Sequence, residues 1–114
     1  MNSTPRFLQG VLSFEGKGLD QPAPFGVPGY VVPAGVVAQA VYFRGGNSAD
    51  ELICVVLMRD GKPMRYFPIG AKADVHVPLR VVEDLDSGTA VELWLAAPAG
   101  VTGTVVLDLG LVEV

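Results

Sequence analysis

The sequence contains few of the residues on which several classes of protein depend. Among its 114 residues there is one cysteine, Cys54, and one histidine, His76. A single cysteine cannot form a disulfide within the chain, and a single histidine leaves a metal site dependent on carboxylates or water for its other ligands. On these grounds we expect no cofactor. No export signal precedes the first apolar segment, and the cytoplasm is favoured over export.

Charged residues are also few, and the basic ones stand singly along the sequence, as Arg59, Lys62 and Arg65 do. Eight Lys and Arg against twelve Asp and Glu give a formal net charge of −4 at pH 7. Because neutralising a phosphate backbone requires clustered cations, nucleic acid is not an expected partner. Gly, Pro or polar residues interrupt every apolar run before the roughly 18 residues of a membrane helix, so no membrane span is expected.

The chain is rich in apolar residues, glycine and proline. Half of the residues are hydrophobic, 14 are Gly and 9 are Pro, and the mean hydropathy is +0.43. This hydrophobic share excludes an intrinsically disordered chain. A chain of 114 residues can bury roughly two thirds of its unfolded surface around one core. We therefore expect residues 1–114 to form a single domain.

Short apolar segments bounded by Gly and Pro predict β-strands and almost no helix. No apolar period of 3.6 residues persists along the chain, and the spacing of turn signals is typical of a β-sandwich or barrel. We expect an all-β, antiparallel fold of about seven or eight strands. The strands are expected at residues 7–14, 36–44, 51–59, 62–67, 75–82, 90–97 and 104–114, and the Pro- and Gly-rich segment 20–29 is expected to be a loop.

The most specific local prediction is a tight hairpin at the Asp-Gly pair 60–61. Asp-Gly tolerates the positive φ angles of a two-residue type I′ turn, and apolar segments flank it on both sides. In this register Arg59 faces Lys62 and Met58 faces Pro63. Because Pro63 has no N–H to donate, the strand that begins at Lys62 is expected at a sheet edge.

Residues 51–59 are unusual because both faces of the predicted strand are apolar. A sandwich strand with one solvated face should alternate apolar and polar residues, and an apolar outer face on a monomer favours aggregation. The C-terminal strand, 104–114, also has apolar residues on its outer face. We therefore expect a homo-oligomer that associates through residues 51–59 and 104–114. In the strand at residues 51–59, the apolar residues are Ile53, Val55 and Leu57 on one face and Leu52, Cys54, Val56 and Met58 on the other.

Aromatic residues are the best candidates for a binding surface. Strand alternation places Trp94 on the same face as Glu92, opposite the apolar residues at 91, 93 and 95. An aromatic side chain on a partly polar face can stack on a sugar ring or anchor a partner, and Tyr42 and Tyr66 are further candidates for this role. The alternative for Trp94 is burial in the core.

No group of residues has the composition of a catalytic site. Cys54 lies in mid-strand without a neighbouring His or Asp and is expected to be a small buried hydrophobe. His76 is expected to point outward from a strand, and the sequence has no Gly-x-Ser-x-Gly segment. Because no base, nucleophile and oxyanion donor can be assembled, we do not expect an enzyme.

Several short segments resemble those of jelly-roll carbohydrate-binding modules. The resemblance covers most of the chain and implies a non-catalytic jelly-roll sandwich. It also implies that Glu15 and Asp108 are candidates for a structural calcium ion that bridges the first and last strands. The segments are Phe14-Glu15-Gly16, Val32-Pro33-Ala34-Gly35 leading to Tyr42-Phe43-Arg44, residues 88–95, and Val105-Val106-Leu107-Asp108.

Two functions follow from these observations. The first is a non-catalytic module that recognises a glycan or similar ligand through Trp94, Tyr42, Tyr66 and Glu92. The second is a homo-oligomeric structural or accessory subunit, such as a capsid, tail or shell component, whose apolar strands are packing surfaces. The first predicts that Trp94 is exposed, and the second that Trp94 or residues 51–59 are buried between subunits.

Overall fold

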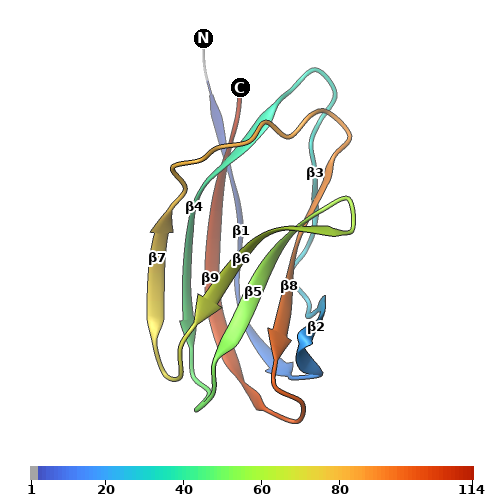
Figure 1. The fold of residues 1–114 in the computed structure, drawn as a ribbon. Coiled ribbons are helices and arrows are strands. Elements are labelled where there is room, and N and C mark those ends of the chain that lie inside the picture. The colour runs from blue at the N-terminus through green and yellow to red at the C-terminus, as the bar shows by residue number, and fades with distance from the viewer. Residues whose placement is uncertain (1–2) are drawn as a thin grey trace.

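The computed structural model describes residues 3–114, which form nine strands and no helix. Two antiparallel sheets pack face to face (Figure 1), so the expected all-β sandwich is confirmed. No helix among these residues is long and apolar enough to cross a membrane. The strands are β1 (Thr4–Glu15), β2 (Gly18–Pro24), β3 (Tyr30–Val31), β4 (Ala38–Asn47), β5 (Ile53–Arg59), β6 (Lys62–Ile69), β7 (Asp74–Pro78), β8 (Ala90–Ala97) and β9 (Thr102–Glu113).

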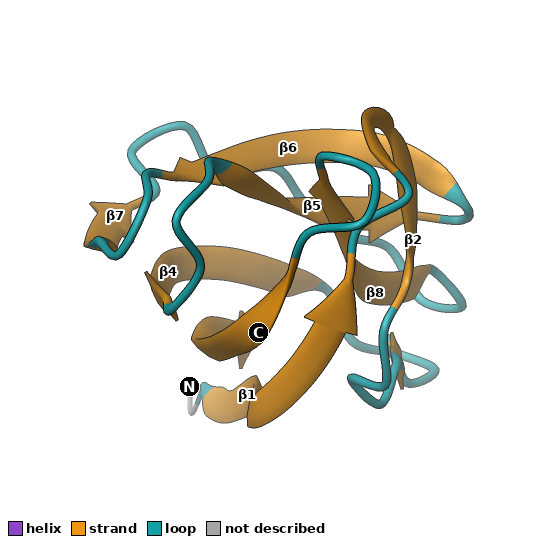
Figure 2. Ribbon diagram, turned by 90° about the horizontal axis from the view of Figure 1, so that it is seen from below, coloured by secondary structure: helices purple, strands orange, loops and turns teal. Residues whose placement is uncertain are grey.

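The strand order is that of a jelly roll. Sheet A has the order β1-β9-β4-β7, and sheet B has the order β2-β8-β5-β6, with the short β3 also paired to β8. Because β2 and β3 share one partner, the two sheets together have the eight strand positions of this fold. Figure 2 shows the two layers end-on. Neighbours such as β1 and β9 are distant in the chain, so each sheet face combines residues from remote segments.

The predicted hairpin at residues 60–61 is confirmed. Its two turn residues have φ angles of 49° and 78°, as a type I′ turn requires. Arg59 pairs with Lys62 and Met58 with Pro63. The register shifts just beyond this pair, and β6 is the edge strand of sheet B, where the missing N–H of Pro63 is tolerated.

Segment 20–29 is partly a strand, which corrects the prediction of a loop. β2 continues to Pro24 and pairs with β8 at only three positions, with a register shift before Ala23. It is the second edge strand of sheet B, opposite β6. An edge strand tolerates proline because one row of its N–H groups needs no partner in the ladder. The irregular part of the segment begins only at Phe25.

Every predicted strand except 90–97 differs from its observed bounds by one to four residues, and the differences at β4 and β7 have a structural reason. β4 continues through two glycines to Asn47 instead of ending at residue 44. A Cβ atom at Gly45 would lie 2.9 Å from side-chain atoms of Phe43 and Ile69, so the glycine allows the inner faces of the two sheets to approach here. β7 ends at Pro78, its last residue paired with β4, instead of continuing to residue 82.

The core fills the space between the inner faces of the sheets. Phe43 of β4 stacks on Phe67 of β6, with ring centroids 4.3 Å apart and planes 5° from parallel. At one end of the core, the side-chain amide of the buried Asn47 donates to the carbonyls of Glu51 and Gly70. These contacts join sheet A to sheet B and to the turns that connect their strands.

Both faces of β5 are buried within the chain itself. Val56 and Met58, on the outer face, are only 1% and 2% exposed. Val56 lies between Trp94 and Tyr66 in the ladder of sheet B. Cys54, on the same face, is half-buried, and burial raises the pKa of its thiol. The apolar outer face of β5 therefore needs no second subunit to remove it from water, and the homo-oligomer stays a prediction.

Candidate functional site

A hollow of about 1180 Å³ lies on the outer face of sheet A. The register of the sheet aligns side chains in rows that cross all four of its strands. Because residues directly opposite one another in a ladder point to the same face, each row presents its side chains together. The first row is Phe7-Gly110-Tyr42-Pro78, the second is Gln9-Asp108-Arg44-His76, and the third is Val11-Val106-Gly46-Asp74. The second and third rows line the hollow.

The second row, Gln9-Asp108-Arg44-His76, is polar throughout, and we call it the polar row. Neighbouring strands lie about 4.8 Å apart, so its four backbone positions span about 14 Å. Gln9 both donates and accepts hydrogen bonds, Arg44 only donates, and an ionised Asp108 only accepts. The polar row can therefore bind a ligand whose groups alternate as donors and acceptors.

Asp108 has one carboxylate oxygen in use and one without a partner. Its Oδ2 accepts a hydrogen bond of 3.0 Å from the hydroxyl of Tyr42. Burial and this bond to Asp108 raise the pKa of Tyr42, so its hydroxyl remains a donor at neutral pH. Oδ1 is buried and has no hydrogen-bond partner among residues 3–114. An unmet buried acceptor costs about 1–3 kcal/mol, and a ligand donor that reached Oδ1 would remove this cost.

Arg44 and His76 are exposed, as is Gln9 at the other end of the polar row. Arg44 faces Asp108 in the ladder, yet within the described residues it forms no ion pair of 4.0 Å or less. The ring of His76 meets that of Tyr42 edge to face, with centroids 6.3 Å apart. Thus Tyr42 packs against His76, while the donors of Arg44 remain available to a ligand.

Two glycines shape the outer face of sheet A. A Cβ atom at Gly110 would lie 2.0 Å from Cε2 of Tyr42, so the tyrosine ring rests directly on this glycine. A Cβ atom at Gly46 would have only the Cβ of Asp74 within 4 Å, at 3.9 Å. The first glycine lets Tyr42 lie flat beside Asp108, and the second leaves the floor of the hollow without a side chain.

Apolar side chains border the polar row on β1 and β9. Phe7 is 53% exposed, Val11 is 70% exposed and Val106 is 52% exposed. Val11 and Val106 face each other in the row next to the polar row. The face therefore combines an exposed apolar strip with hydrogen-bonding groups of both kinds.

The four ligand-binding residues predicted from the sequence do not lie together. Tyr42 is on the outer face of sheet A, next to the hollow, where it bonds to Asp108. Trp94, Tyr66 and Glu92 are on the outer face of sheet B, on the opposite side of the sandwich. Tyr66 is 63% exposed, whereas Trp94 is half-buried and its Nε1 is buried without a partner among residues 3–114.

The structure does not bring the two calcium candidates together. Glu15 pairs with Thr102 at one end of the β1–β9 ladder and bonds to Lys17, whereas Asp108 pairs with Gln9. The distance along β1 from Gln9 to Glu15 is about 20 Å, so one calcium ion could not bind both carboxylates. The part of the chain that the structure describes holds no cluster of three or more His, Cys, Asp or Glu side chains suited to a metal.

Sequence reasoning does not single out Gln9 or Arg44, and it treats His76 as an ordinary outward-facing residue. Alternation within each strand does assign these residues to an outer face. It does not show that β1, β9, β4 and β7 are neighbours, because that order depends on pairing between segments far apart in the chain. The missing information is therefore the register that aligns Gln9 with Asp108 and Arg44.

No protein-family model matches the sequence, and no curated protein matches it significantly. Two solved structures that are similar to it are of an exo-β-1,3-galactanase from Phanerochaete chrysosporium, one with galactose and one of a variant with β-1,3-galactotriose. The first has a TM-score of 0.40 and 16% identity, covering 100% of this chain and 30% of that chain. The second has a TM-score of 0.35 and 15% identity, covering 93% and 29%. This chain thus spans less than a third of the enzyme chain, and the proposal below rests on the geometry of sheet A alone.

Proposed function

We propose that this chain is a non-catalytic binding module that holds a carbohydrate against the outer face of sheet A. The observation that carries the proposal is the polar row across all four strands, which lines the hollow with hydrogen-bond donors and acceptors. This assignment keeps Tyr42 from the residues predicted by sequence. It replaces Trp94, Tyr66 and Glu92 with Gln9, Arg44 and His76.

The chemistry of the hollow suits a neutral sugar. A sugar presents hydroxyl groups that donate and accept hydrogen bonds, and C–H faces that pack against apolar side chains. The polar row offers partners to the hydroxyl groups, and Val11 and Val106 offer an apolar surface beside it. Arg44 offsets one of the two negative charges of Asp74 and Asp108 in the same hollow. No single sign of charge dominates, which favours a neutral glycan over a strongly charged one.

The hydrogen bond of Asp108 to Tyr42 supports a binding role over glycoside hydrolysis. Asp74 and Asp108 both line the hollow. In the ladder they stand two strands and one row apart, which is about 12 Å between backbone positions. Their side chains can shorten this distance, so the spacing alone does not distinguish the pair from the two carboxyl groups of a glycosidase, which lie about 5 to 10 Å apart. Asp108 is also bonded to Tyr42, which suits a fixed acceptor for a ligand hydroxyl.

Affinity electrophoresis in gels that contain soluble neutral polysaccharides tests this proposal. The expected result is retardation of the native chain by at least one polysaccharide of the panel. Arg44→Ala is expected to weaken this retention about tenfold or more, because a sugar hydroxyl loses a charge-assisted hydrogen bond. Asp108→Asn is expected to weaken it too, because the amide can place a donor where the ligand hydroxyl donates.

Arg80→Ala is the matched control, because Arg80 is an exposed arginine outside the hollow. It should leave retention unchanged. Trp94→Ala separates the two faces of the sandwich: if it abolishes retention while Arg44→Ala does not, the sugar binds to sheet B and the assignment to sheet A is wrong. Retention that no substitution in the polar row alters would also overturn the assignment.

A homo-oligomeric structural subunit is the second candidate, favoured by one observation on the same face. β1 is a twelve-residue edge strand of sheet A, and its exposed Phe7 and Val11 adjoin the exposed Val106. Exposed apolar edges favour association between copies. Light scattering during size-exclusion chromatography distinguishes the candidates. A dimer that Val11→Lys dissociates would favour assembly, and a monomer of 12.0 kDa would exclude it.

A further inference from the structure

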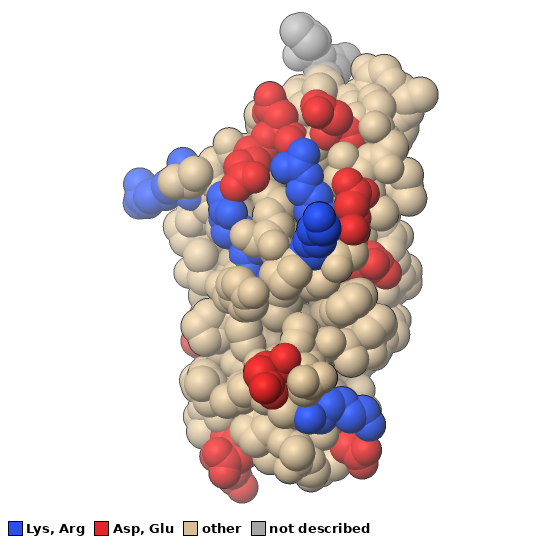
Figure 3. All heavy atoms as spheres, turned by 45° about the vertical axis from the view of Figure 1, so that its right-hand side comes forward, with Lys and Arg blue, Asp and Glu red and all other residues tan. Residues whose placement is uncertain are grey.

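Three of the eight basic residues of this acidic chain meet at one end of sheet B. Arg59 ends β5, and Lys62 and Arg65 belong to β6, so the hairpin brings together cations that stand singly in the sequence. They line a hollow of about 560 Å³ together with Asp60, which accepts from the backbone N–H of Ala90, and with Glu83 from the segment between β7 and β8. Figure 3 shows basic side chains gathered in the upper half of one face of the molecule, with acidic side chains around them.

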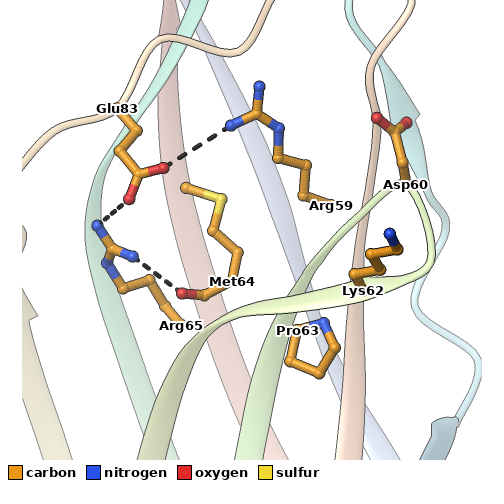
Figure 4. A pocket seen from close by; sticks show the side chains of 7 residues that line it. All are labelled: Arg59, Asp60, Lys62, Pro63, Met64, Arg65 and Glu83. Atoms are coloured by element: carbon orange, nitrogen blue, oxygen red, sulfur yellow. Dashed lines mark hydrogen bonds and ion pairs between the residues drawn. The ribbon is translucent and has the colours of Figure 1, made fainter.

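The two arginines converge on one carboxylate from different strands. Arg65 bonds to Oε1 of Glu83, and the nearest guanidinium nitrogen of Arg59 lies 3.7 Å from Oε2 (Figure 4). A carboxylate that uses one oxygen for each of two guanidinium groups shows that the pair is spaced for a planar oxyanion. The two arginines of this hollow thus already bind one carboxylate, that of Glu83.

The basic residues keep donors that the fold does not use. Arg65 is engaged on two sides, because it also donates to the carbonyl of Met64 at 2.9 Å. Arg59 reaches Glu83 only beyond hydrogen-bond distance, so most of its five N–H donors remain available. Lys62 forms no ion pair of 4.0 Å or less within residues 3–114. Arg59 and Lys62 can therefore donate hydrogen bonds to an anion that enters from solvent.

Glu83 is anchored more weakly than the arginines that hold it. The arginines extend from paired strands of sheet B, whereas Glu83 lies in an irregular segment in which Val81 is 72% and Val82 is 39% exposed. The next residue, Asp84, accepts a hydrogen bond of 2.8 Å from the side chain of Gln39, and the segment enters the core at the fully buried Leu85. Moving Glu83 out of the hollow needs no rearrangement of either sheet.

We propose that Arg59, Lys62 and Arg65 form a binding site for the carboxylate group of a ligand, which Glu83 occupies as a competing carboxylate of the chain itself. The ligand displaces Glu83 from Arg59 and gains the free donors of Lys62. Pro63 and Met64 supply apolar walls beside the cations, so the group that carries the carboxylate is compact and not fully polar. This site is at the end of sheet B and is independent of the hollow on sheet A.

Titration of the nitrogen-15-labelled full chain with sodium malonate, followed by NMR, tests the proposal. Malonate is a compact carboxylate, and sodium chloride of matched ionic strength is the reference. The expected result is a saturable shift of the backbone amides of residues 59–62, 64, 65 and 83 with malonate only. Glu83→Gln is expected to bind malonate about two- to fivefold more tightly, because an exposed ion pair no longer competes.

Arg59→Gln and Lys62→Gln are expected to weaken malonate binding, and Lys17→Gln, which removes one positive charge elsewhere, should leave it unchanged. Equal shifts with sodium chloride, or unchanged binding in Arg59→Gln, would show that the cluster is only a structural ion-pair network. A stronger response to sodium sulfate than to malonate would overturn the assignment to a carboxylate. The backbone amides of the polar row lie on sheet A and would respond separately to a sugar. Absence of malonate binding would therefore not contradict the sugar site on sheet A.

Discussion

The outer faces of the two sheets have the same strand architecture but differ in what they leave open. On sheet A the central positions include Gly46, Asp108 and Gly110, and the face is hollowed beside the polar row. On sheet B the central positions include Val56 and Met58, which neighbouring side chains of the same chain bury. Small residues in mid-ladder, and not aromatic residues, therefore determine where the outer face of this sandwich is open to a ligand.

The largest expected effect comes from placing a charge at the centre of each face. Val56→Asp should lower the free energy of unfolding by about 3–4 kcal/mol, because it buries an unpaired carboxylate. Val106→Asp, on the 52% exposed valine of sheet A, should cost less than about 1 kcal/mol. Urea unfolding of both variants measures the difference. Equal losses would show that the two faces do not differ in burial.

Gly110→Ala tests whether glycine is what lets the ring of Tyr42 lie beside Asp108. The new Cβ would overlap the ring of Tyr42, so the ring must move and its bond to Asp108 should break. Such overpacking costs about 1–3 kcal/mol, and polysaccharide retention should fall with it. Gly46→Ala is the matched control, because its Cβ would meet only Asp74 at 3.9 Å. If the two variants have the same free energy of unfolding, the close approach of Tyr42 to Gly110 does not contribute to stability.

Much of the fold could be predicted from the sequence because its signals are local. The hairpin at residues 60–61 depends on two turn residues, and its register follows from the turn type. The edge position of β6 follows from Pro63 in the same way. The prolines of β2 carry the same signal, and the prediction of a loop is wrong there because Pro22 and Pro24 lie in an edge strand, which tolerates them.

The candidate sites could be predicted only in part because they depend on contacts between remote segments. Tyr42 was predicted, but its partner Asp108 is 66 residues away in the chain. The apolar outer face of β5 was interpreted as a subunit interface, although Trp94 and Tyr66 flank it within the chain. Alternation gives the face of a residue, and only the sheet order gives its neighbours.

Trp94 gives a spectroscopic test of the same comparison, because it is the only tryptophan of the chain and lies on the outer face of sheet B. Saturation of the sheet A hollow with a sugar should leave its fluorescence emission unchanged. A marked shift of emission on binding would place the sugar on sheet B instead. Trp94→Phe should change the free energy of unfolding by less than about 1 kcal/mol, because the lost ring area is offset by removal of a buried N–H without a partner.

The smallest expected effect concerns two tyrosine–carboxylate pairs of β9, of which one is open and one is closed. Asp108 accepts only from Tyr42 and keeps one oxygen unpartnered among the described residues. Glu113, 8% exposed, accepts from the hydroxyl of Tyr30 at 2.5 Å and from Nε of Arg6 at 3.0 Å. These bonds, that of Tyr30 first, lower the pKa of Glu113, and burial together with Glu113 raises the pKa of Tyr30 to about 12.

The closed pair should therefore contribute stability that depends on pH at both extremes. Since the pKa of Glu113 is lower in the folded chain, its contribution is present above the ordinary carboxyl value of 4.5 and is lost as the pH falls below it. The contribution of Tyr30 is lost as the pH rises above 10. Urea unfolding between about pH 5 and about pH 3 should show a smaller loss of stability in Glu113→Gln than in the native chain. Glu51→Gln, an exposed carboxylate at the other end of the sandwich, controls for the change of one charge, and the same flattening in both variants would show that Glu113 is not held by its two donors.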